Sequence, residues 1–140
     1  MNMRIVLAED SESLGQIVKI KLQNAGYIVS WARDGETAWN MILLEQPALV
    51  ILDIMMPKIS GFEVLNSLKL HPETVQIPVM MMTARAVEED VRRSIAGGAT
   101  DYIVKPFKPD NLVQRVNRLL QVTQPQISKD DGSGRELARK

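Results

Sequence analysis

Acidic, hydroxyl and basic side chains stand at the ends of separate apolar runs in this chain. Asp53 directly follows the run Ala48 to Leu52, and a carboxylate at the end of a buried strand is costly unless a partner neutralises it. Candidate partners stand at the ends of three further apolar runs, namely Glu9 with Asp10, Thr83 and Lys105. Three acids, a hydroxyl and a lysine at one sheet edge predict a site for a metal ion and a phosphoryl group.

Five short apolar runs alternate with stretches of helical periodicity, which predicts a parallel sheet with crossover helices on both faces. The expected strands cover residues 3–8, 27–32, 48–53, 78–82 and 101–104. The second run is more mixed than the others, as is typical of an edge strand. The carboxyl ends of parallel strands lie at one edge of a sheet, so this arrangement would bring the reactive side chains together.

Capping residues and apolar stripes predict five helices. The expected starting points are Ser11 or Ser13, Asp34, Gly61, residue 87 and the residue after Pro109. The first helix is expected to end at Gly26. Its apolar stripe consists of Leu14, Val18, Leu22 and Ala25. The last helix is expected to bury Leu112, Val113, Val116, Leu119 and Leu120.

Length and composition limit the class of protein. The 140 residues suffice for one domain with a sizeable core, expected over residues 1–122, and the polar segment 123–140 is typical of a flexible tail or truncated linker. Seventeen basic and seventeen acidic residues give a net charge of zero, which favours neither nucleic acid nor membrane binding. The chain has no cysteine, no run of membrane-spanning length and no signal peptide, so a cytoplasmic protein is expected.

The strand-end residues together resemble a known family. The ordered pattern Glu9-Asp10, Asp53 with Pro57 and Gly61, Thr83-Ala84 and Lys105-Pro106-Phe107 is similar to the receiver domains of two-component response regulators, chemotaxis regulators included. The segment from Gly98 to Phe107 carries much of this likeness, and the spacing agrees over about 120 residues. The resemblance implies a flavodoxin-like α/β fold, a doubly wound five-stranded parallel sheet in the order 2-1-3-4-5 with five helices.

The resemblance also implies a chemistry. Asp53 is then the nucleophile that accepts a phosphoryl group from a sensor histidine kinase or a histidine phosphotransfer protein, assisted by Lys105 and Thr83. The chain would catalyse its own phosphorylation and dephosphorylation without being an enzyme in the usual sense. By resemblance, a cis bond is expected between Lys105 and Pro106, which the low cost of cis X-Pro bonds allows.

A Mg²⁺ or Mn²⁺ site is part of the same implication. Asp10 and Asp53 would bind the ion directly, Glu9 through water, and Met55 with its backbone carbonyl. A hard divalent ion with oxygen ligands would relieve the repulsion among the three carboxylates. By resemblance, Met55 and Arg85 tune the lifetime of the phosphoryl group, and neither side chain is suited to activate water, which predicts a long lifetime.

Switch and partner residues are implied as well. Thr83 would turn toward the phosphoryl group and Tyr102 would fill the vacated space, altering the surface of the fourth helix, fifth strand and fifth helix. Ile20, with Pro106 and Phe107, fits the family's face for the histidine kinase.

The charges on the switch surface leave two interpretations open. Asp101, Arg115 and Arg118 resemble part of the charge set for phosphorylation-dependent homodimers, and solvated helix charge is the simpler interpretation. Asn111 and Ala96 stand where the dimerising members usually have acids.

Other functions remain as alternatives. A degenerate receiver could bind partners without phosphorylation. An aspartyl-phosphate hydrolase would usually carry a second acid at the position of Met55. A flavin mononucleotide carrier could share the fold, but the acids Glu9 and Asp10 would repel its phosphate. A nucleotide-binding protein is excluded by the absence of both glycine-rich phosphate motifs.

Overall fold

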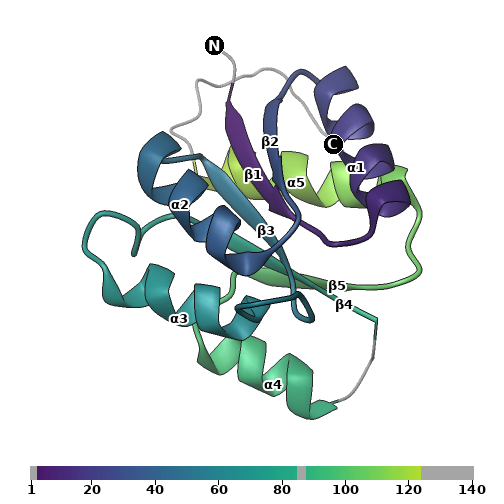
Figure 1. Ribbon diagram of the computed structural model, residues 1–140. Coiled ribbons are helices and arrows are strands. Elements are labelled where there is room, and N and C mark those ends of the chain that lie inside the picture. Colours follow the sequence, from purple (N-terminus) through teal and green to yellow (C-terminus); the bar gives the residue numbers. More distant parts are fainter. Residues whose placement is uncertain (1–2, 85–87, 124–140) are drawn as a thin grey trace.

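The fold is a five-stranded parallel sheet with helices on both faces (Figure 1). The structure, a computed structural model, describes residues 3–84 and 88–123. The strands are β1 (Arg4–Ala8), β2 (Ile28–Ala32), β3 (Leu49–Asp53), β4 (Val79–Thr83) and β5 (Asp101–Val104). The helices are α1 (Glu12–Asn24), α2 (Gly35–Glu45), α3 (Gly61–Leu70), α4 (Glu88–Ala96) and α5 (Pro109–Thr123). The sheet order β2-β1-β3-β4-β5 confirms the predicted topology.

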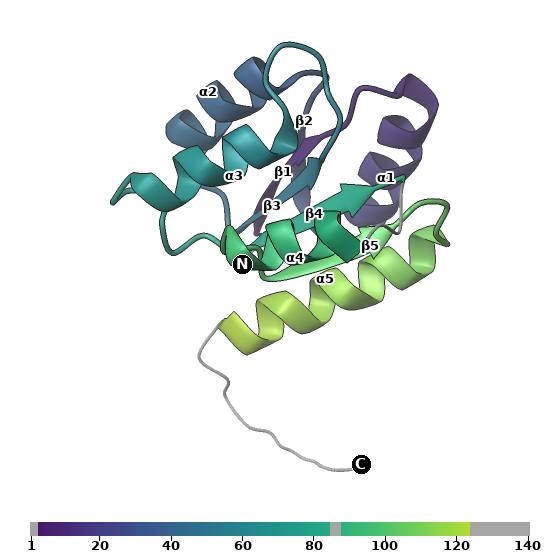
Figure 2. The ribbon, with the colours of Figure 1, turned by 90° about the horizontal axis from the view of Figure 1, so that it is seen from below.

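Two apolar layers sandwich the sheet, with α1 and α5 on one face and α2, α3 and α4 on the other (Figures 1 and 2). Alternate residues of the central strands pack into one or the other apolar layer, because successive side chains of a strand point to opposite faces of the sheet. In β3, Val50 and Leu52 pack toward α2 and α3, while Leu49 and Ile51 pack toward α1 and α5. All five residues of β3 and of β4 are buried, which explains why these two strands read as unbroken apolar runs.

Side-chain caps fix the starts of three helices. Ser11, one of the two candidates, caps α1 by accepting a hydrogen bond from the Leu14 amide. Asp34 caps α2 as predicted, with its Oδ1 2.8 Å from the amide nitrogen of Thr37. At α3, Ser60 and Glu63 form a capping box, in which each side chain accepts from the other residue's backbone amide.

Some sequence predictions need small corrections. Ala25 is exposed because α1 ends at Asn24 and Ala25 is its C-cap; Gly26 follows with a positive φ of 104°. Val113 and Leu119 of α5 are half-buried, because α5 lies on the surface and only one of its sides faces the sheet. β4 extends to Thr83, one residue beyond the expected end. Residues 124–140, nearly all of the expected tail, lie outside the described residues, and no helix among the described ones could span a membrane.

Candidate functional site: a carboxylate cluster at the strand ends

The carboxyl ends of the strands meet at one edge of the sheet and bring the predicted residues together. Asp53 ends β3 and is in register with Met82 of β4, while Thr83 ends β4 and is in register with Val104 of β5. Glu9 follows β1 directly, and Lys105 follows β5 directly. Strand register therefore joins side chains that are far apart in sequence.

Glu9, Asp10 and Asp53 form a group that we call the carboxylate cluster. One carboxylate oxygen of each residue lies within 4.8 Å of the others. Glu9 is fully buried and Asp53 is 4% exposed, whereas Asp10 is exposed. Hard oxygen donors with one open side fit a divalent cation such as Mg²⁺, which uses few protein ligands and retains several waters. The cluster could therefore hold a metal ion.

Lys105 neutralises part of this negative charge. Its Nζ lies 2.9 Å from Oε1 of Glu9 and donates a hydrogen bond to Oδ2 of Asp53 at 3.1 Å. The contact with Glu9 is an ion pair between a partly buried ammonium group and a fully buried carboxylate. Burial alone would lower the pKa of Lys105, but pairing with Glu9 and the charge on Asp53 raise it above its ordinary value. The ammonium group therefore stays charged.

The surroundings of Asp53 disfavour the ionisation of its carboxyl group. Burial, and then the nearby charge of Glu9, raise the pKa of Asp53 from 3.8 to about 7. Lys105 and the backbone amide of Met55, which lies 3.3 Å from Oδ1 of Asp53, act in the opposite direction without cancelling the rise. The ionised form of such a carboxyl group is stabilised when a cation or a further hydrogen-bond donor approaches it.

Gly61 allows α3 to begin directly against the end of β3. A Cβ at this position would lie 2.3 Å from the backbone oxygen of Asp53 and 2.9 Å from Cα of Ile54. The Gly61 amide also donates to the Ile54 carbonyl at 2.8 Å. Since the crowded atoms are backbone, no side-chain rotation can make room.

We expect Gly61→Ala to lower the free energy of unfolding by about 1–3 kcal/mol, because the methyl group must displace the backbone that carries Asp53. Urea unfolding of both proteins measures this loss. Gly97→Ala is the matched control, since the nearest atom there is a side-chain methyl group of Leu65, at 2.9 Å. Equal losses in the two variants would contradict a special backbone constraint at Gly61.

Thr83 and Tyr102, the residues predicted to switch, lie on the neighbouring strands β4 and β5. Thr83 is 4% exposed at the end of β4. Tyr102 is partly buried against the layer of α2 and α3, and its backbone oxygen accepts a hydrogen bond from Arg115. Met55 is 65% exposed, so its side chain points to solvent beside Asp53. Arg85 lies outside the described residues.

The predicted partner residues divide between two surfaces. Ile20 on α1 is 47% exposed, as expected for a residue off the apolar stripe. Pro106 and Phe107 help to line an open, apolar groove of about 400 Å³ with Leu14 and Lys105, and the bond before Pro106 is cis. On the other surface the carboxylate of Asp101 lies 3.7 Å from the guanidinium of Arg115.

The sequence prediction missed two residues that contact the acid pair. Nε1 of Trp31 donates to the Glu9 carbonyl at 2.9 Å, and Nη2 of Arg33 donates to the Asp10 carbonyl at 3.1 Å. The sequence signal that could have identified Trp31 and Arg33 was their position at the end of β2, the strand that pairs with β1. A tryptophan in an edge strand is more often explained by packing, so the spacing alone did not identify it.

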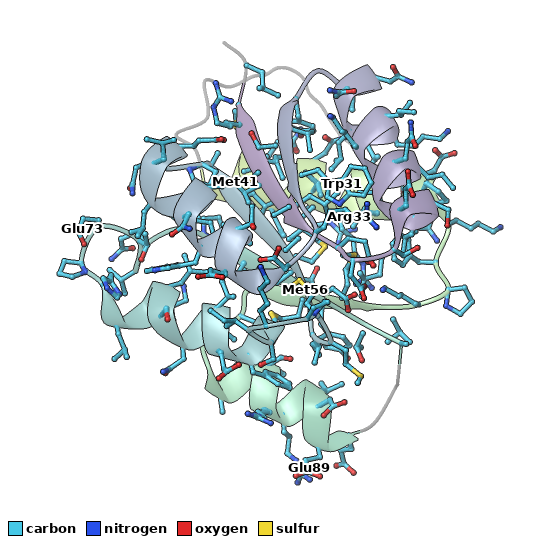
Figure 3. All side chains as sticks on the ribbon, viewed as in Figure 1. Trp31, Arg33, Met41, Met56, Glu73 and Glu89 are labelled. Atoms are coloured by element: carbon cyan, nitrogen blue, oxygen red, sulfur yellow. The ribbon has the colours of Figure 1, made fainter. Side chains whose placement is uncertain are left out.

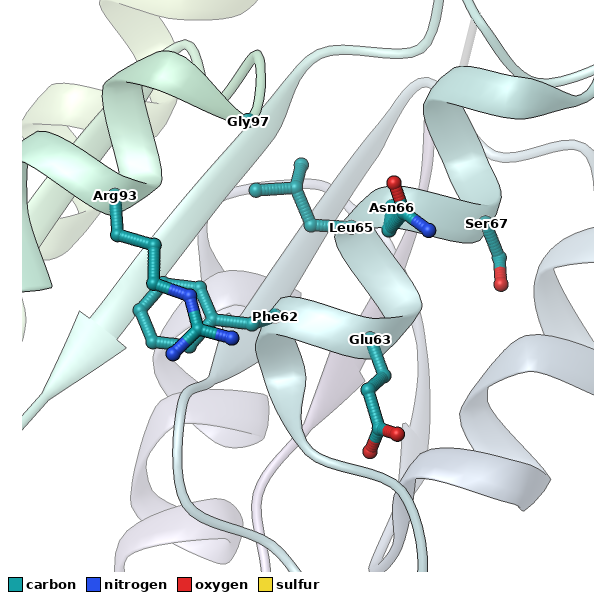
Figure 4. Close-up of a pocket in the computed structure, with 7 residues that line it drawn as sticks. All are labelled: Phe62, Glu63, Leu65, Asn66, Ser67, Arg93 and Gly97. Carbon is teal, nitrogen blue, oxygen red and sulfur yellow. The ribbon is translucent and has the colours of Figure 1, made fainter.

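A groove between α3 and α4 was also not predicted (Figure 4). It has a volume of about 460 Å³, and the guanidinium carbon of Arg93 lies 4.1 Å from the centroid of the Phe62 ring. The groove is lined by Phe62, Glu63, Leu65, Asn66, Ser67, Arg93 and Gly97. None of these residues belongs to the carboxylate cluster.

Comparison with known families agrees with this geometry. The family described as "Response regulator receiver domain" matches residues 5–117, a range that contains the carboxylate cluster, Thr83 and Lys105. The chain therefore belongs to the response regulator receiver family. This confirms the resemblance inferred from the strand-end motifs.

Individual relatives show how far the likeness extends. The phosphate regulon transcriptional regulatory protein PhoB of Rhizobium meliloti is 36% identical over 124 residues, which are 89% of this chain and 55% of PhoB. The chain thus spans about half the length of the curated relatives it matches.

Solved structures support the same likeness. The receiver domain of the Francisella response regulator 1452 superposes with a TM-score of 0.82 at 29% identity, covering 88% of this chain and 100% of that one. Chemotaxis protein CheY4 of Vibrio cholerae gives 0.80 at 31% identity, covering 84% and 98%.

Proposed function

We propose that the chain is a phosphorylation-controlled switch in which Asp53 accepts a phosphoryl group from a sensor histidine kinase or a histidine phosphotransfer protein. The observation that carries this proposal is the buried Asp53 carboxylate, which lies within the carboxylate cluster and 3.1 Å from the Lys105 ammonium. Membership of the receiver family supports it. The rival hydrolase is disfavoured because Met55, without an acid group, stands two residues after Asp53.

In the proposed reaction, an Asp53 carboxylate oxygen attacks the phosphorus atom. The new O–P bond forms as the P–N bond to the donor histidine breaks, and the departing imidazole nitrogen takes a proton from solvent. With a pKa of about 7, a substantial part of Asp53 is protonated at neutral pH, and a divalent cation at the carboxylate cluster would shift it toward the ionised form that attacks. Lys105 is placed to contact a phosphoryl oxygen after transfer, because its Nζ already contacts Asp53.

A Mg²⁺ or Mn²⁺ ion held by Glu9, Asp10, Asp53 and the Met55 carbonyl would neutralise charge that develops on the phosphoryl oxygens. Backbone and side-chain groups of this chain contribute the rest. Ser11 orients Glu9 by donating its backbone amide to Oε2 at 2.9 Å. The buried position of Glu9 and Asp53 limits the access of bulk water.

Output would follow from Thr83 and Tyr102. A phosphoryl group adds about 1.5–2 negative charges and three acceptor oxygens, toward which the Thr83 hydroxyl can turn. Tyr102 would then move inward and change the surface of α4, β5 and α5. Asp101 and Arg115 belong to that surface, which we propose as the contact with a target or with a second copy of the phosphorylated chain.

Kinase docking belongs to the other side of the site. Ile20 is exposed on α1, and Pro106 and Phe107 follow Lys105 directly. We propose that the donor protein contacts these residues as it presents its phosphohistidine to Asp53.

Incubation with acetyl phosphate tests the proposed function. Intact-mass measurement should show the gain of one phosphoryl group with Mg²⁺ and none with chelator. Asp53→Asn should abolish the gain. A folded protein that gains nothing with Mg²⁺ would instead favour the receiver that binds partners without phosphorylation, and an undiminished gain in Asp53→Asn would place the phosphoryl group elsewhere.

We also expect the phosphoryl group to be long-lived and to be lost several-fold faster in Met55→Asn. The exposed thioether of Met55 cannot orient a water molecule, whereas an amide can. The decay of phosphorylated protein after removal of acetyl phosphate measures the rate. Leu44→Asn, at a residue 84% exposed on α2, controls for added surface polarity. Rapid decay in the wild type, unchanged or slowed in Met55→Asn, would contradict the expectation.

A further inference from the structure

Three consecutive residues around the end of β2 hold the backbone of the acid pair. Nε1 of Trp31 donates to the Glu9 carbonyl at 2.9 Å, and the Glu9 amide donates to the Ala32 carbonyl at 3.0 Å. Arg33 donates to the Asp10 carbonyl from both Nε and Nη2, at 3.3 and 3.1 Å. The segment that supplies two of the three clustered carboxylates is therefore fixed from the neighbouring strand.

The Trp31 ring packs against α1 at a position that only glycine can occupy. A Cβ on Gly15 of α1 would lie 2.1 Å from Cζ2 of the ring and 2.6 Å from its Nε1. Arg33 adds a cation–π contact, with its guanidinium carbon 5.6 Å from the centroid of the ring. Figure 3 shows Trp31 and Arg33 next to each other near the start of α1. The indole is thus wedged so that its donor faces the Glu9 carbonyl.

This support bears on the carboxylate cluster because its members repel one another. Glu9 and Asp53 are buried like charges, and a mobile β1–α1 turn would let them separate. Groups that hydrogen-bond around metal ligands commonly change affinity ten- to a hundredfold when they are removed, because they fix the ligands before the ion arrives. Trp31 and Arg33 contact the backbone of the acid pair without offering a ligand atom.

We infer that Trp31 and Arg33 are positioning residues that set the affinity of the carboxylate cluster for a divalent cation by holding Glu9 and Asp10 in place. The inference rests on the metal site of the proposed function. It differs from that proposal in assigning metal affinity to side chains that touch neither the ion nor the phosphoryl group.

Titration of the full chain with Mn²⁺ tests the inference, and electron paramagnetic resonance measures the concentration of free Mn²⁺. Trp31→Phe keeps an aromatic ring and removes the N–H donor, and we expect its Kd for Mn²⁺ to rise about tenfold, the lower end of the effect of losing such a supporting hydrogen bond. Trp39→Phe is the matched control. Trp39 packs edge-on against His71 at a centroid distance of 4.9 Å, and its variant should keep the wild-type Kd.

Arg33→Lys provides a second variant in case Trp31→Phe fails to fold. It keeps the positive charge but loses the planar two-donor contact with the Asp10 carbonyl, so its Kd should also rise. An unchanged Kd in the folded variants, or an equal rise in Trp31→Phe and Trp39→Phe, overturns this inference but leaves the proposed metal site standing. Absence of Mn²⁺ binding in the wild type overturns the proposed metal site as well, which separates the two failures.

Discussion

Lys105→Met is expected to lower the free energy of unfolding by about 3–5 kcal/mol at neutral pH, because it leaves buried carboxylates without their cation. Lys105 pairs with Glu9, which is fully buried, and with Asp53, which is nearly so. Methionine preserves most of the length and packing of the side chain, so the loss reports mainly on charge. Guanidinium unfolding in the presence of a chelator measures the effect.

The pH dependence of this loss has a definite sign. Lys105 lowers the pKa of Asp53 in the folded state, so without Lys105 that pKa rises further above its value in the unfolded chain. The penalty is therefore relieved as the pH falls toward about 4 and grows as the pH rises. Lys108→Met, at an exposed lysine three residues away, should cost less than about 0.5 kcal/mol. A similar loss in both variants, or one independent of pH, would contradict the assigned role of Lys105.

The fold was largely predictable because the local signals agree with the tertiary arrangement. β3 and β4 read as continuous apolar runs since both of their faces are covered, and β2 reads as mixed since it forms an edge. The deviations arise where burial depends on geometry. Ala25 fits the helical spacing of α1 but lies past its end, and Leu119 lies at the margin of the buried face of α5.

The site was predictable only in part. Glu9, Asp10, Asp53 and Lys105 could be grouped because each follows an apolar run, and parallel strands align such positions. The contacts from Trp31 and Arg33 could not be inferred in the same way, since they depend on the register of β2 against β1. The space beside Gly15 that seats the Trp31 ring is likewise a property of packing, which no local spacing encodes.

Asp53→Asn is expected to stabilise the metal-free protein, the opposite of what Lys105→Met does. The pKa of Asp53 is raised from 3.8 to about 7 in the folded state, chiefly by burial and then by Glu9. A proton is therefore bound more tightly in the folded chain, so stability falls as the pH rises from about 4 to about 7 and stays reduced above that range. At about pH 8 the asparagine variant should be more stable by on the order of 2–4 kcal/mol, and near pH 4 the difference should vanish.

Urea unfolding across this pH range, with chelator and with Mg²⁺, measures the effect. If the proposed metal site is correct, Mg²⁺ should stabilise the wild type more than the variant and narrow this difference in stability, because the ion would bind the ionised carboxylates of the folded state. Asp110→Asn, at a side chain 79% exposed, is the control and should change stability by less than about 0.5 kcal/mol. A metal-free wild type that is the more stable protein at about pH 8 would contradict the raised pKa. Opposite signs at Asp53 and Lys105, whose charged atoms are 3.1 Å apart, would mean that the carboxyl is kept at a cost to stability and the lysine limits that cost.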